Sequence, residues 1–273
     1  MPDASTPSIA DDLALALRLA DEASALALEL LARGTSSARK ADGTVVTNAD
    51  LALERMLSAA LASERPDDAV LGEELGGASG APRRWILDPI DGTRNYVAGR
   101  PDWGVHIALE HGQEVIVGVV TRPALGTRWW AGRGCGAYVG SSTGNGAAAS
   151  LGVSPRHSLT DARVSGWLFD GDPLKDRLRA LPGWIEPVDL DAIMRVAEGG
   201  LEVFVDGTQS QIWDRAPHVV LVEEAGGRYQ DRAGGKDLDL PGALLTNGGI
   251  EAELDEFLGR ASSPHTRARN SIT

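Results

Sequence analysis

The sequence of 273 residues contains a single cysteine and no long apolar run. Cys135 has no intramolecular partner for a disulfide, which is typical of proteins of the reducing cytosol, and we assign it no catalytic role. No apolar stretch approaches the ~18 residues that a membrane-spanning helix needs. The polar, acidic residues 1–8 also lack the basic start of a secretory signal. We therefore expect a cytoplasmic protein without a membrane partner.

Basic residues are scarce relative to acidic ones. The chain has 26 Lys and Arg against 39 Asp and Glu, which gives a net charge of −13. A nucleic-acid partner requires a basic patch, so none is expected. Hydrophobic residues at 42% and charged residues at 24% are ordinary for a globular protein, and the length is sufficient for one large core or two coupled smaller ones.

The most informative segment is the run Trp-Ile-Leu-Asp-Pro-Ile-Asp-Gly-Thr at residues 85–93. Its apolar start predicts the end of a buried strand, and we expect strand pairing to stop at Pro89 because proline has no amide hydrogen. Asp88 and Asp91 follow on one tight turn, together with the carbonyl of Ile90 and the hydroxyl of Thr93. Such a set of oxygen atoms suits a hard cation such as Mg²⁺. Taken alone, the spacing fits equally a turn that caps a helix.

Four further acidic residues favour the metal site, because each of them also lies at the boundary of an expected element. Glu73 and Glu74 follow an expected strand over 69–72. Asp50 opens a helical pattern over 49–62, and Asp214 precedes another over 215–226, where it fits the N-cap with Pro217 in the first turn. Solvated surface charge is rarely confined to element boundaries in this way.

The periodicity predicts helices and strands along the whole chain. Glycine-rich residues 140–149 form the expected linker between an N-terminal α+β domain, residues 1–140, and a C-terminal α/β domain, residues 150–262, which supplies Asp214. Residues 262–273 are expected to be a disordered tail. The expected helices are 9–33, 49–62, 173–180, 189–199 and 215–226, and the expected strands are 69–72, 85–88, 104–110, 114–121, 127–131, 162–169 and 201–205, with a hairpin turn at 111–113.

These acidic segments resemble the signatures of the inositol monophosphatase superfamily. The resemblance rests on Glu73-Glu74, on the run 85–93, on Trp213-Asp214 with Ala216, and on Thr47 to Asp50, which matches an upstream Thr-x-x-Asp element. It implies an α+β or α/β fold, the layered α-β-α-β-α sandwich of the inositol monophosphatase and fructose-1,6-bisphosphatase type. It also implies a metal-dependent, lithium-sensitive phosphomonoesterase that acts on a small phosphorylated metabolite and forms a homodimer.

The resemblance assigns a role to each residue of these motifs. Two or three Mg²⁺ ions are expected, with Mn²⁺ as a possible substitute and Li⁺ as an inhibitor. The implied metal ligands are Glu73, Asp88, the carbonyl of Ile90, Asp91 and Asp214; the catalytic residues are Thr93, Asp50 and Glu73; and the substrate contacts are Asp91, Gly92, Thr93, Arg94, Asp189 and Asp214. Because this acidic cluster would repel a phosphate ester, we expect activity to depend on the metal.

The substrate is indicated by a second group of motifs. Where inositol phosphatases usually carry Gly-Ser-Ala, this chain reads Pro-Val-Asp-Leu-Asp at 187–191. Asp189 with Val-Ala-Glu-Gly at 196–199 looks like the histidinol-phosphate phosphatase branch, as do residues 101–103 and 124–130. Asp189 would suit a cationic amine or imidazole, although it could equally be the N-cap of helix 189–199.

Several alternatives stay open at this point. Val188 and Leu190 depart from the glycine and the aromatic residue of the histidinol-phosphate branch, so inositol 1-phosphate or another sugar or nucleoside monophosphate is an alternative substrate. A different class is a catalytically inactive, metal-binding regulatory homologue. We favour an enzyme over this class because no ligand is lost and the pair Thr93 and Asp50 is kept.

Overall fold

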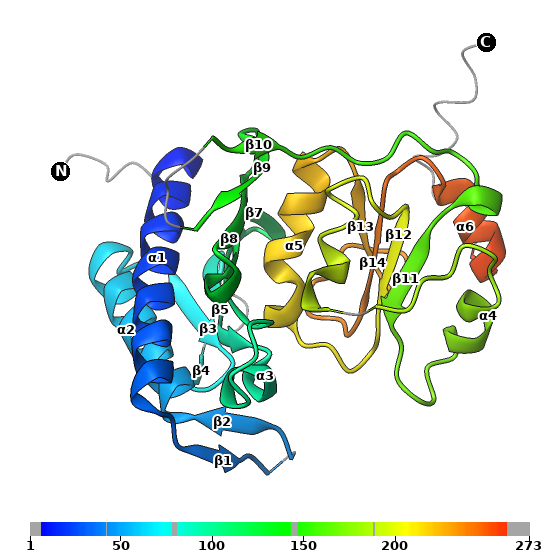
Figure 1. The fold of residues 1–273 in the computed structure, drawn as a ribbon. Coiled ribbons are helices and arrows are strands. Elements are labelled where there is room, and N and C mark those ends of the chain that lie inside the picture. Colours follow the sequence, from blue (N-terminus) through cyan, green and yellow to red (C-terminus); the bar gives the residue numbers. More distant parts are fainter. Residues whose placement is uncertain (1–6, 42, 78–80, 143–146, 188, 261–273) are drawn as a thin grey trace. The chain divides into compact units, whose positions relative to one another are not determined.

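The computed structural model describes residues 7–41, 43–77, 81–142, 147–187 and 189–260. They form two compact units, the first within Met1–Ser150 and Trp213–Glu224, the second within Leu151–Ile212 and Ala225–Thr273 (Figure 1). The first boundary agrees with the expected linker, of which residues 143–146 lie outside the described residues. The expected tail from 262 also lies outside them. The helix that carries Asp214, by contrast, groups with the first unit and not with the second, as its packing below explains.

Two long helices open the first unit, and both begin with a capping box. Helix α1, Ile9–Arg33, starts after Ser8, whose hydroxyl accepts a hydrogen bond from the amide of Asp11. Helix α2, Asn48–Glu64, starts after Thr47. Asp50 is therefore the third helical residue and not the cap, and its carboxylate accepts a hydrogen bond from the Thr47 amide. Buried alanines and leucines on α1 and α2 form one core with the sheet described next.

The sheet of the first unit has eight strands in the order β10-β9-β8-β7-β6-β5-β3-β4. Neighbouring strands are antiparallel except for β3 and β5, which are parallel. The predicted hairpin turn is confirmed, since Gly112 and Gln113 both have positive φ, 61° and 69°, between the paired residues His111 and Glu114. The strands are β3 Ala69–Gly72, β4 Gly76–Gly77, β5 Arg83–Asp91, β6 Gly104–His111, β7 Glu114–Arg122, β8 Thr127–Gly132, β9 Gly136–Ser141 and β10 Ala149–Ser150. A separate two-stranded hairpin pairs β1, Ser37–Arg39, with β2, Val45–Thr47.

Strand β5 continues past Pro89, contrary to the expectation that pairing stops there. Its pairing with β6 shifts register between Asp88 and Asp91: Asp88 lies opposite His106, and Asp91 lies opposite Gly104. Proline cannot donate to the ladder, and the sheet accommodates it with an irregularity. The bulge at the end of β5 thus presents both carboxylates.

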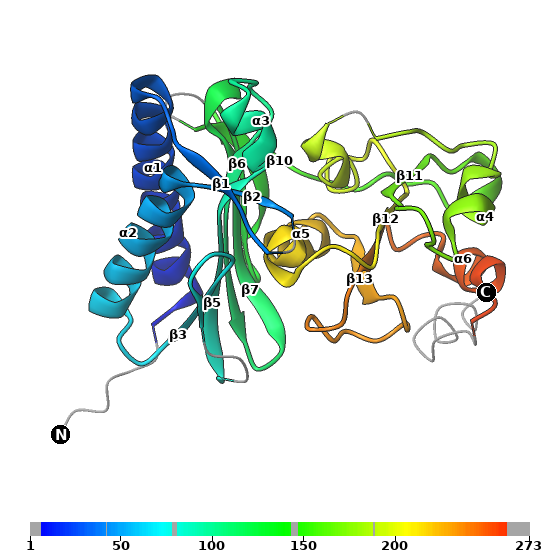
Figure 2. The same cartoon turned by 90° about the horizontal axis from the view of Figure 1, so that it is seen from below.

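Helix α5, Ile212–Glu224, covers the face of the eight-stranded sheet opposite to α1 and α2 (Figure 2). Close packing holds it there, because a Cβ atom on Gly118 of β7 would lie 2.4 Å from the carbonyl oxygen of Pro217. Asp214 lies in the first turn of this helix, so it is not the N-cap that the sequence suggested, and Pro217 lies inside the helix. Asp214 is therefore brought to the first unit by a helix that is distant in sequence.

The second unit contains a four-stranded sheet in the order β11-β12-β14-β13, whose core includes residues of helices α4 and α6. The expected helix 189–199 is wrong: only Leu190–Ile193 forms a 3₁₀ turn, η3, and further turns follow. Met194, Val196 and Ala197 are all fully buried, a pattern that one face of an α-helix cannot provide. The elements are β11 Val164–Trp167, α4 Lys175–Arg179, β12 Val203–Asp206, β13 Arg228–Asp231, β14 Ala243–Thr246 and α6 Glu251–Leu258, with short 3₁₀ turns η1 Pro123–Leu125 and η2 Leu159–Asp161.

Candidate active site

Three of the predicted ligands converge in the first unit. Asp88 and Asp91 come from the bulged end of β5, and Asp214 comes from the first turn of α5. Each carboxylate offers one oxygen, and these three oxygens all lie within 4.8 Å of one another. Among the described residues, this is the one group of three or more acidic, histidine or cysteine side chains close enough to hold a metal ion.

The electrostatics of this cluster call for a cation. Asp88 is 2% exposed, and its Oδ1 atom has no hydrogen-bond partner among the described residues. Burial raises the pKa of Asp88 well above its ordinary value, and the charges of Glu73, Asp91 and Asp214 raise it further. A buried carboxylate that lacks a partner is costly unless it is neutralised. The unpartnered oxygen and its carboxylate neighbours therefore fit a divalent metal ion.

Glu73 and Glu74, which follow β3, both form ion pairs with a lysine that the sequence analysis did not identify. Lys40 Nζ lies 2.8 Å from Glu73 Oε1 and 2.7 Å from Glu74 Oε1. Burial raises the pKa of Glu74 to about 7, while the hydrogen bond from Lys40 opposes this rise. The amide of Glu73 donates to the Leu87 carbonyl at 3.2 Å, which fixes the end of β3 beside the acidic end of β5.

Thr93 makes the hydrogen bonds expected of the predicted catalytic pair. Its hydroxyl lies 3.3 Å from Asp50 Oδ1 and 3.0 Å from the carbonyl oxygen of Ile90. Asp50 is fully buried, and its other oxygen accepts hydrogen bonds from the amide and hydroxyl of Thr47. Gly92 precedes the short helix α3, Thr93–Val97, with a left-handed φ of 80°. A hydroxyl has one hydrogen to donate. If a cation occupied the Ile90 carbonyl oxygen, the Thr93 hydroxyl would therefore donate its hydrogen bond to Asp50.

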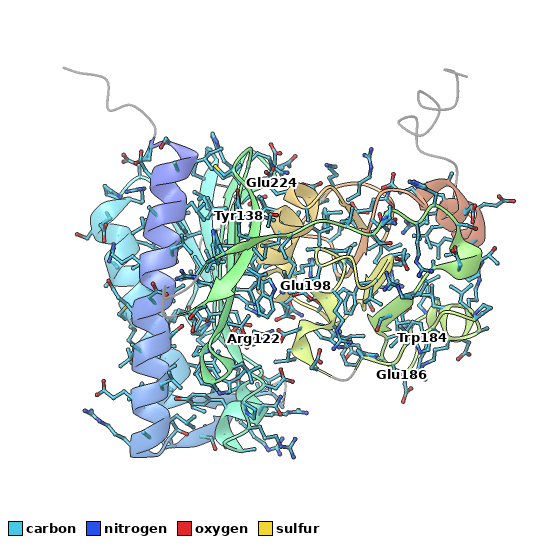
Figure 3. All side chains as sticks on the ribbon, turned by 45° about the horizontal axis from the view of Figure 1, so that its top comes forward. Arg122, Tyr138, Trp184, Glu186, Glu198 and Glu224 are labelled. Carbon is cyan, nitrogen blue, oxygen red and sulfur yellow. The ribbon has the colours of Figure 1, made fainter. Side chains whose placement is uncertain are left out.

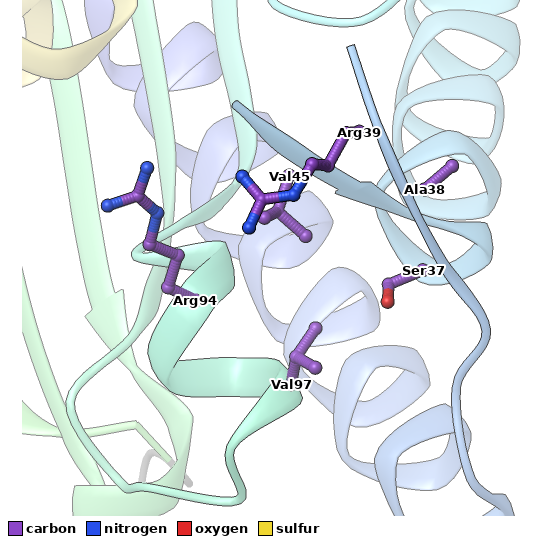
Figure 4. A pocket seen from close by; sticks show the side chains of 6 residues that line it. All are labelled: Ser37, Ala38, Arg39, Val45, Arg94 and Val97. Atoms are coloured by element: carbon purple, nitrogen blue, oxygen red, sulfur yellow. The ribbon is translucent and has the colours of Figure 1, made fainter. Parts of the chain in front are cut away.

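Arg94, a predicted substrate contact, borders a pocket of about 390 Å³ between α3 and the β1–β2 hairpin (Figure 4). The guanidinium groups of Arg39 and Arg94 lie on the same side of this pocket. Arg39 also donates to the carbonyl of Gly43 at 3.2 Å. The pocket is lined by Ser37, Ala38, Arg39, Val45, Arg94 and Val97.

Asp189 belongs to the second unit and is a partner of Arg195. The two side chains form an ion pair at 2.6 Å, each about one-third exposed. Asp189 does occupy the N-cap position of η3, but its side chain makes no capping hydrogen bond there. Its Oδ1 atom has no hydrogen-bond partner among the described residues. Arg195 thus already compensates part of the charge that was expected to bind a cation.

A buried basic group behind Asp91 was missed by the sequence analysis. The side chains of Arg122 and His106 lie 3.3 Å and 3.4 Å from Asp91 Oδ2. Burial lowers the pKa of His106 well below its ordinary value, and the charge of Arg122 lowers it further. No local sequence pattern indicates these contacts, since Asp91, His106 and Arg122 come from β5, β6 and β7 and meet only through the register of the sheet.

Comparison with known proteins agrees with this geometry. A model described as "Inositol monophosphatase family" matches residues 10–267, and the chain belongs to this family. The family consists of metal-dependent phosphoric monoester hydrolases, and this chain is accordingly a phosphatase of that class. Its fold is the inositol monophosphatase fold, as expected: an inositol monophosphatase of Thermotoga maritima superimposes with a TM-score of 0.76 at 26% identity, covering 91% of this chain and 97% of that one.

Two relatives are more similar in sequence to this chain than that structure is. A "Histidinol-phosphatase" of Streptomyces coelicolor is 38% identical over 266 residues, which cover 93% of this chain and 99% of that protein. A Streptomyces griseus protein named "Glucose-1-phosphate thymidylyltransferase" is 44% identical over 236 residues, which cover 84% of this chain and 88% of that protein. Within the described part of the chain, none of the helices combines the length and apolar character needed to cross a membrane.

The packing of α5 gives a first prediction. In Gly118→Ala the new Cβ would lie 2.4 Å from the Pro217 carbonyl oxygen and 2.7 Å from Val220, so the helix must shift. We expect a loss of about 1–3 kcal/mol in the free energy of unfolding, as is usual for overpacking, together with weaker Mg²⁺ binding because Asp214 moves with the helix. Chemical denaturation and calorimetric titration would measure both effects.

Gly152→Ala is the matched control, because a Cβ atom there meets nothing within 4 Å and its φ is not left-handed. Unchanged Mg²⁺ affinity in Gly118→Ala would show that Asp214 does not depend on this contact.

Proposed function

We propose that the chain hydrolyses L-histidinol phosphate to L-histidinol in the cytoplasm, as a step of histidine biosynthesis, with Mg²⁺ as its cofactor. The observation that carries the hydrolytic part is the convergence of Asp88, Asp91 and Asp214, whose oxygens lie within 4.8 Å of one another. The Thr93–Asp50 pair lies beside the bulge that bears two of these carboxylates. Carboxylates that hold cations next to a positioned hydroxyl are suited to phosphoryl transfer to water.

Each side chain has a role in this proposal. Bound Mg²⁺ ions would neutralise the carboxylates and stabilise negative charge on the phosphoryl oxygens. Asp88, Asp91 and Asp214 would hold them, together with Glu73 and the Ile90 carbonyl. The hydroxyl of Thr93 donates a hydrogen bond to Asp50, so its oxygen lone pairs stay available to accept a hydrogen bond from the attacking water. The amides of Gly92 and Thr93 would hold the phosphate group.

Two observations support histidinol phosphate as the substrate. The relative from Streptomyces coelicolor carries the name histidinol-phosphatase and is matched over nearly its whole length. The chain also keeps the Asp189 and Val-Ala-Glu-Gly motif of that branch. An ammonium group of the substrate would share Asp189 with Arg195 through the free Oδ1 atom.

A substrate panel tests the proposal. Phosphate release should be measured with and without Mg²⁺ for histidinol phosphate, inositol 1-phosphate, fructose 1,6-bisphosphate and a nucleoside monophosphate. We expect the highest kcat/KM for histidinol phosphate and no turnover without a divalent ion. Pyrophosphate release from thymidine triphosphate and glucose 1-phosphate tests the transfer named for the Streptomyces griseus relative. A higher kcat/KM for any other substrate would contradict the proposed one. Sedimentation would test the homodimer that the family resemblance implies.

Asp189→Asn gives a prediction on specificity. If the substrate carries an ammonium or imidazolium group, the variant loses a charge-assisted hydrogen bond. The value of kcat/KM for histidinol phosphate should then fall, because its activation free energy rises by about 1–3 kcal/mol. Turnover of an uncharged aryl phosphate should be nearly unchanged. Asp170→Asn is the control, since that side chain is fully exposed in the same unit. Equal losses on both substrates would remove Asp189 from substrate recognition.

A further inference from the structure

Arg122 is a buried cation that contacts Asp91 of the acidic cluster. Arg122, at the end of β7, is fully buried (labelled in Figure 3). Its Nη2 atom lies 3.3 Å from Asp91 Oδ2, and its Nη1 atom donates to His106 Nε2 and to the Thr121 carbonyl, both at 3.2 Å. Arginine cannot lose its proton in a protein, so this positive charge is permanent.

The sheet leaves space for this guanidinium by means of a glycine. A Cβ atom on Gly104 of β6 would lie 2.1 Å from Arg122 Nη1 and 1.9 Å from the Thr121 carbonyl oxygen. Gly104 is also the residue that pairs with Asp91 beyond the bulge. The bulge and the absence of a side chain at Gly104 therefore leave room for the Arg122 guanidinium to contact Oδ2 of Asp91.

The other charged and titratable groups around this site make Asp91 the counter-ion of Arg122. His106 and His218 pack edge to face, with ring centroids 5.0 Å apart. One oxygen each of Asp88, Asp91 and Asp214 lies within 4.8 Å of the others. Burial raises the pKa of Asp91, but Arg122 opposes this rise. Both Arg122 and His106 approach Oδ2 of Asp91.

We propose that Arg122 is a positioning residue with two opposing effects on the metal centre. It fixes the carboxylate of Asp91 through Oδ2, and it is a permanent cation that repels any metal ion bound there. The inference rests on the metal-dependent hydrolysis proposed above. Metal binding is therefore weaker than the carboxylates alone would provide, but the ligand geometry is defined before the metal arrives.

The two effects predict changes of opposite sign when Arg122 is replaced. Arg122→Met removes the charge and the hydrogen bonds and fits the same space, because methionine is smaller and unbranched. Mg²⁺ should bind more tightly, by roughly 10-fold, because a like charge near the ions is lost. The value of kcat should nevertheless fall by at least ~10-fold, because Asp91 is no longer held in place. A merely structural role would weaken both.

The experiment measures Mg²⁺ affinity by calorimetric titration of protein first stripped with a chelator, and kcat at saturating Mg²⁺, for the wild type, Arg122→Met and Arg122→Lys. Arg122→Lys keeps the charge but cannot donate from two arms. We expect its Mg²⁺ affinity within about 3-fold of the wild type and a reduced kcat. Thermal melting of each stripped protein checks that it folds.

Two results would overturn the inference: Mg²⁺ binding that is weaker or unchanged in Arg122→Met, or an unchanged kcat in both variants. If Arg122→Met does not fold, Arg122→Lys decides alone, and Mg²⁺ binding that is lost together with kcat would count against the inference. A wild-type protein that binds no Mg²⁺ would instead refute the proposed cofactor, so the two failures are distinguishable.

Discussion

Asp88→Asn is expected to reduce kcat by ~100-fold or more while it stabilises the metal-free protein. The loss of activity follows because a charged ligand is removed from the centre of the cluster. The gain in stability follows because Asp88 is 2% exposed, lacks a partner for Oδ1 and faces the charges of Glu73, Asp91 and Asp214. Removing a buried, uncompensated charge should raise the free energy of unfolding by about 1–2 kcal/mol, or the Tm by roughly 2–8 °C.

The measurement compares thermal melting in a chelator and in saturating Mg²⁺ with turnover of the same samples. Wild-type protein should gain stability from Mg²⁺ by mass action, and Asp88→Asn should gain much less. Glu22→Gln is the control, because this carboxylate is about half exposed and pairs at the surface with Arg18, which is equally exposed. A metal-free Asp88→Asn protein that melts below the wild type would show that Asp88 serves the fold and not the metal.

The pH dependence of the metal-free protein tests the same assignment. The folded protein raises the pKa of Asp88 well above 3.8 and that of Glu74 from 4.5 to about 7, so it binds protons more tightly than the unfolded chain does. The stability that these protons provide is complete below the ordinary pKa values and is lost as the pH rises through the raised ones. Metal-free Tm should therefore fall towards neutral pH, and saturating Mg²⁺ should reduce that dependence. Asp88→Asn should have a flatter profile than the wild type.

Most elements of the first unit could be predicted because short stretches of sequence define them. Helix 9–33 has an apolar stripe and a capping box, and the hairpin at 111–113 has a glycine in a two-residue turn. The acidic run 85–93 identified Asp88 and Asp91 because both ligands lie on one turn of the chain. Each of these features depends on neighbouring residues alone.

Features that depend on contacts distant in sequence were not predictable. Asp214 was placed in the wrong domain because the packing of α5 depends on Gly118, nearly a hundred residues upstream. The segment 189–199 has a helical spacing, but Met194, Val196 and Ala197 are all buried, which one face of a helix does not allow, so tertiary packing overrides its propensity. The guanidinium of Arg122 contacts Asp91 only because β5, β6 and β7 pair in one particular register. A single charged residue in a strand gives no indication of such a partner.

Thr93→Ala is expected to reduce kcat by ~100-fold while KM changes no more than a few-fold. The variant keeps the backbone amides and every carboxylate of the cluster, so binding of metal and phosphate should persist. It loses the hydroxyl that lies 3.3 Å from Asp50 Oδ1 and 3.0 Å from the Ile90 carbonyl, and with it the group that orients the attacking water.

Two further variants separate the hydroxyl of Thr93 from its shape. Thr93→Ser keeps the hydroxyl and should retain most of kcat, whereas Thr93→Val keeps the shape but not the hydroxyl and should behave like Thr93→Ala. Calorimetric titration should give the same Mg²⁺ affinity for all three, because the hydroxyl is not a ligand in this assignment. If Thr93→Ala raises KM and leaves kcat unchanged, Thr93 only binds substrate. If Thr93→Val is as active as the wild type, the methyl group and not the hydroxyl is what the site requires, and the Asp50 hydrogen bond has no part in the reaction.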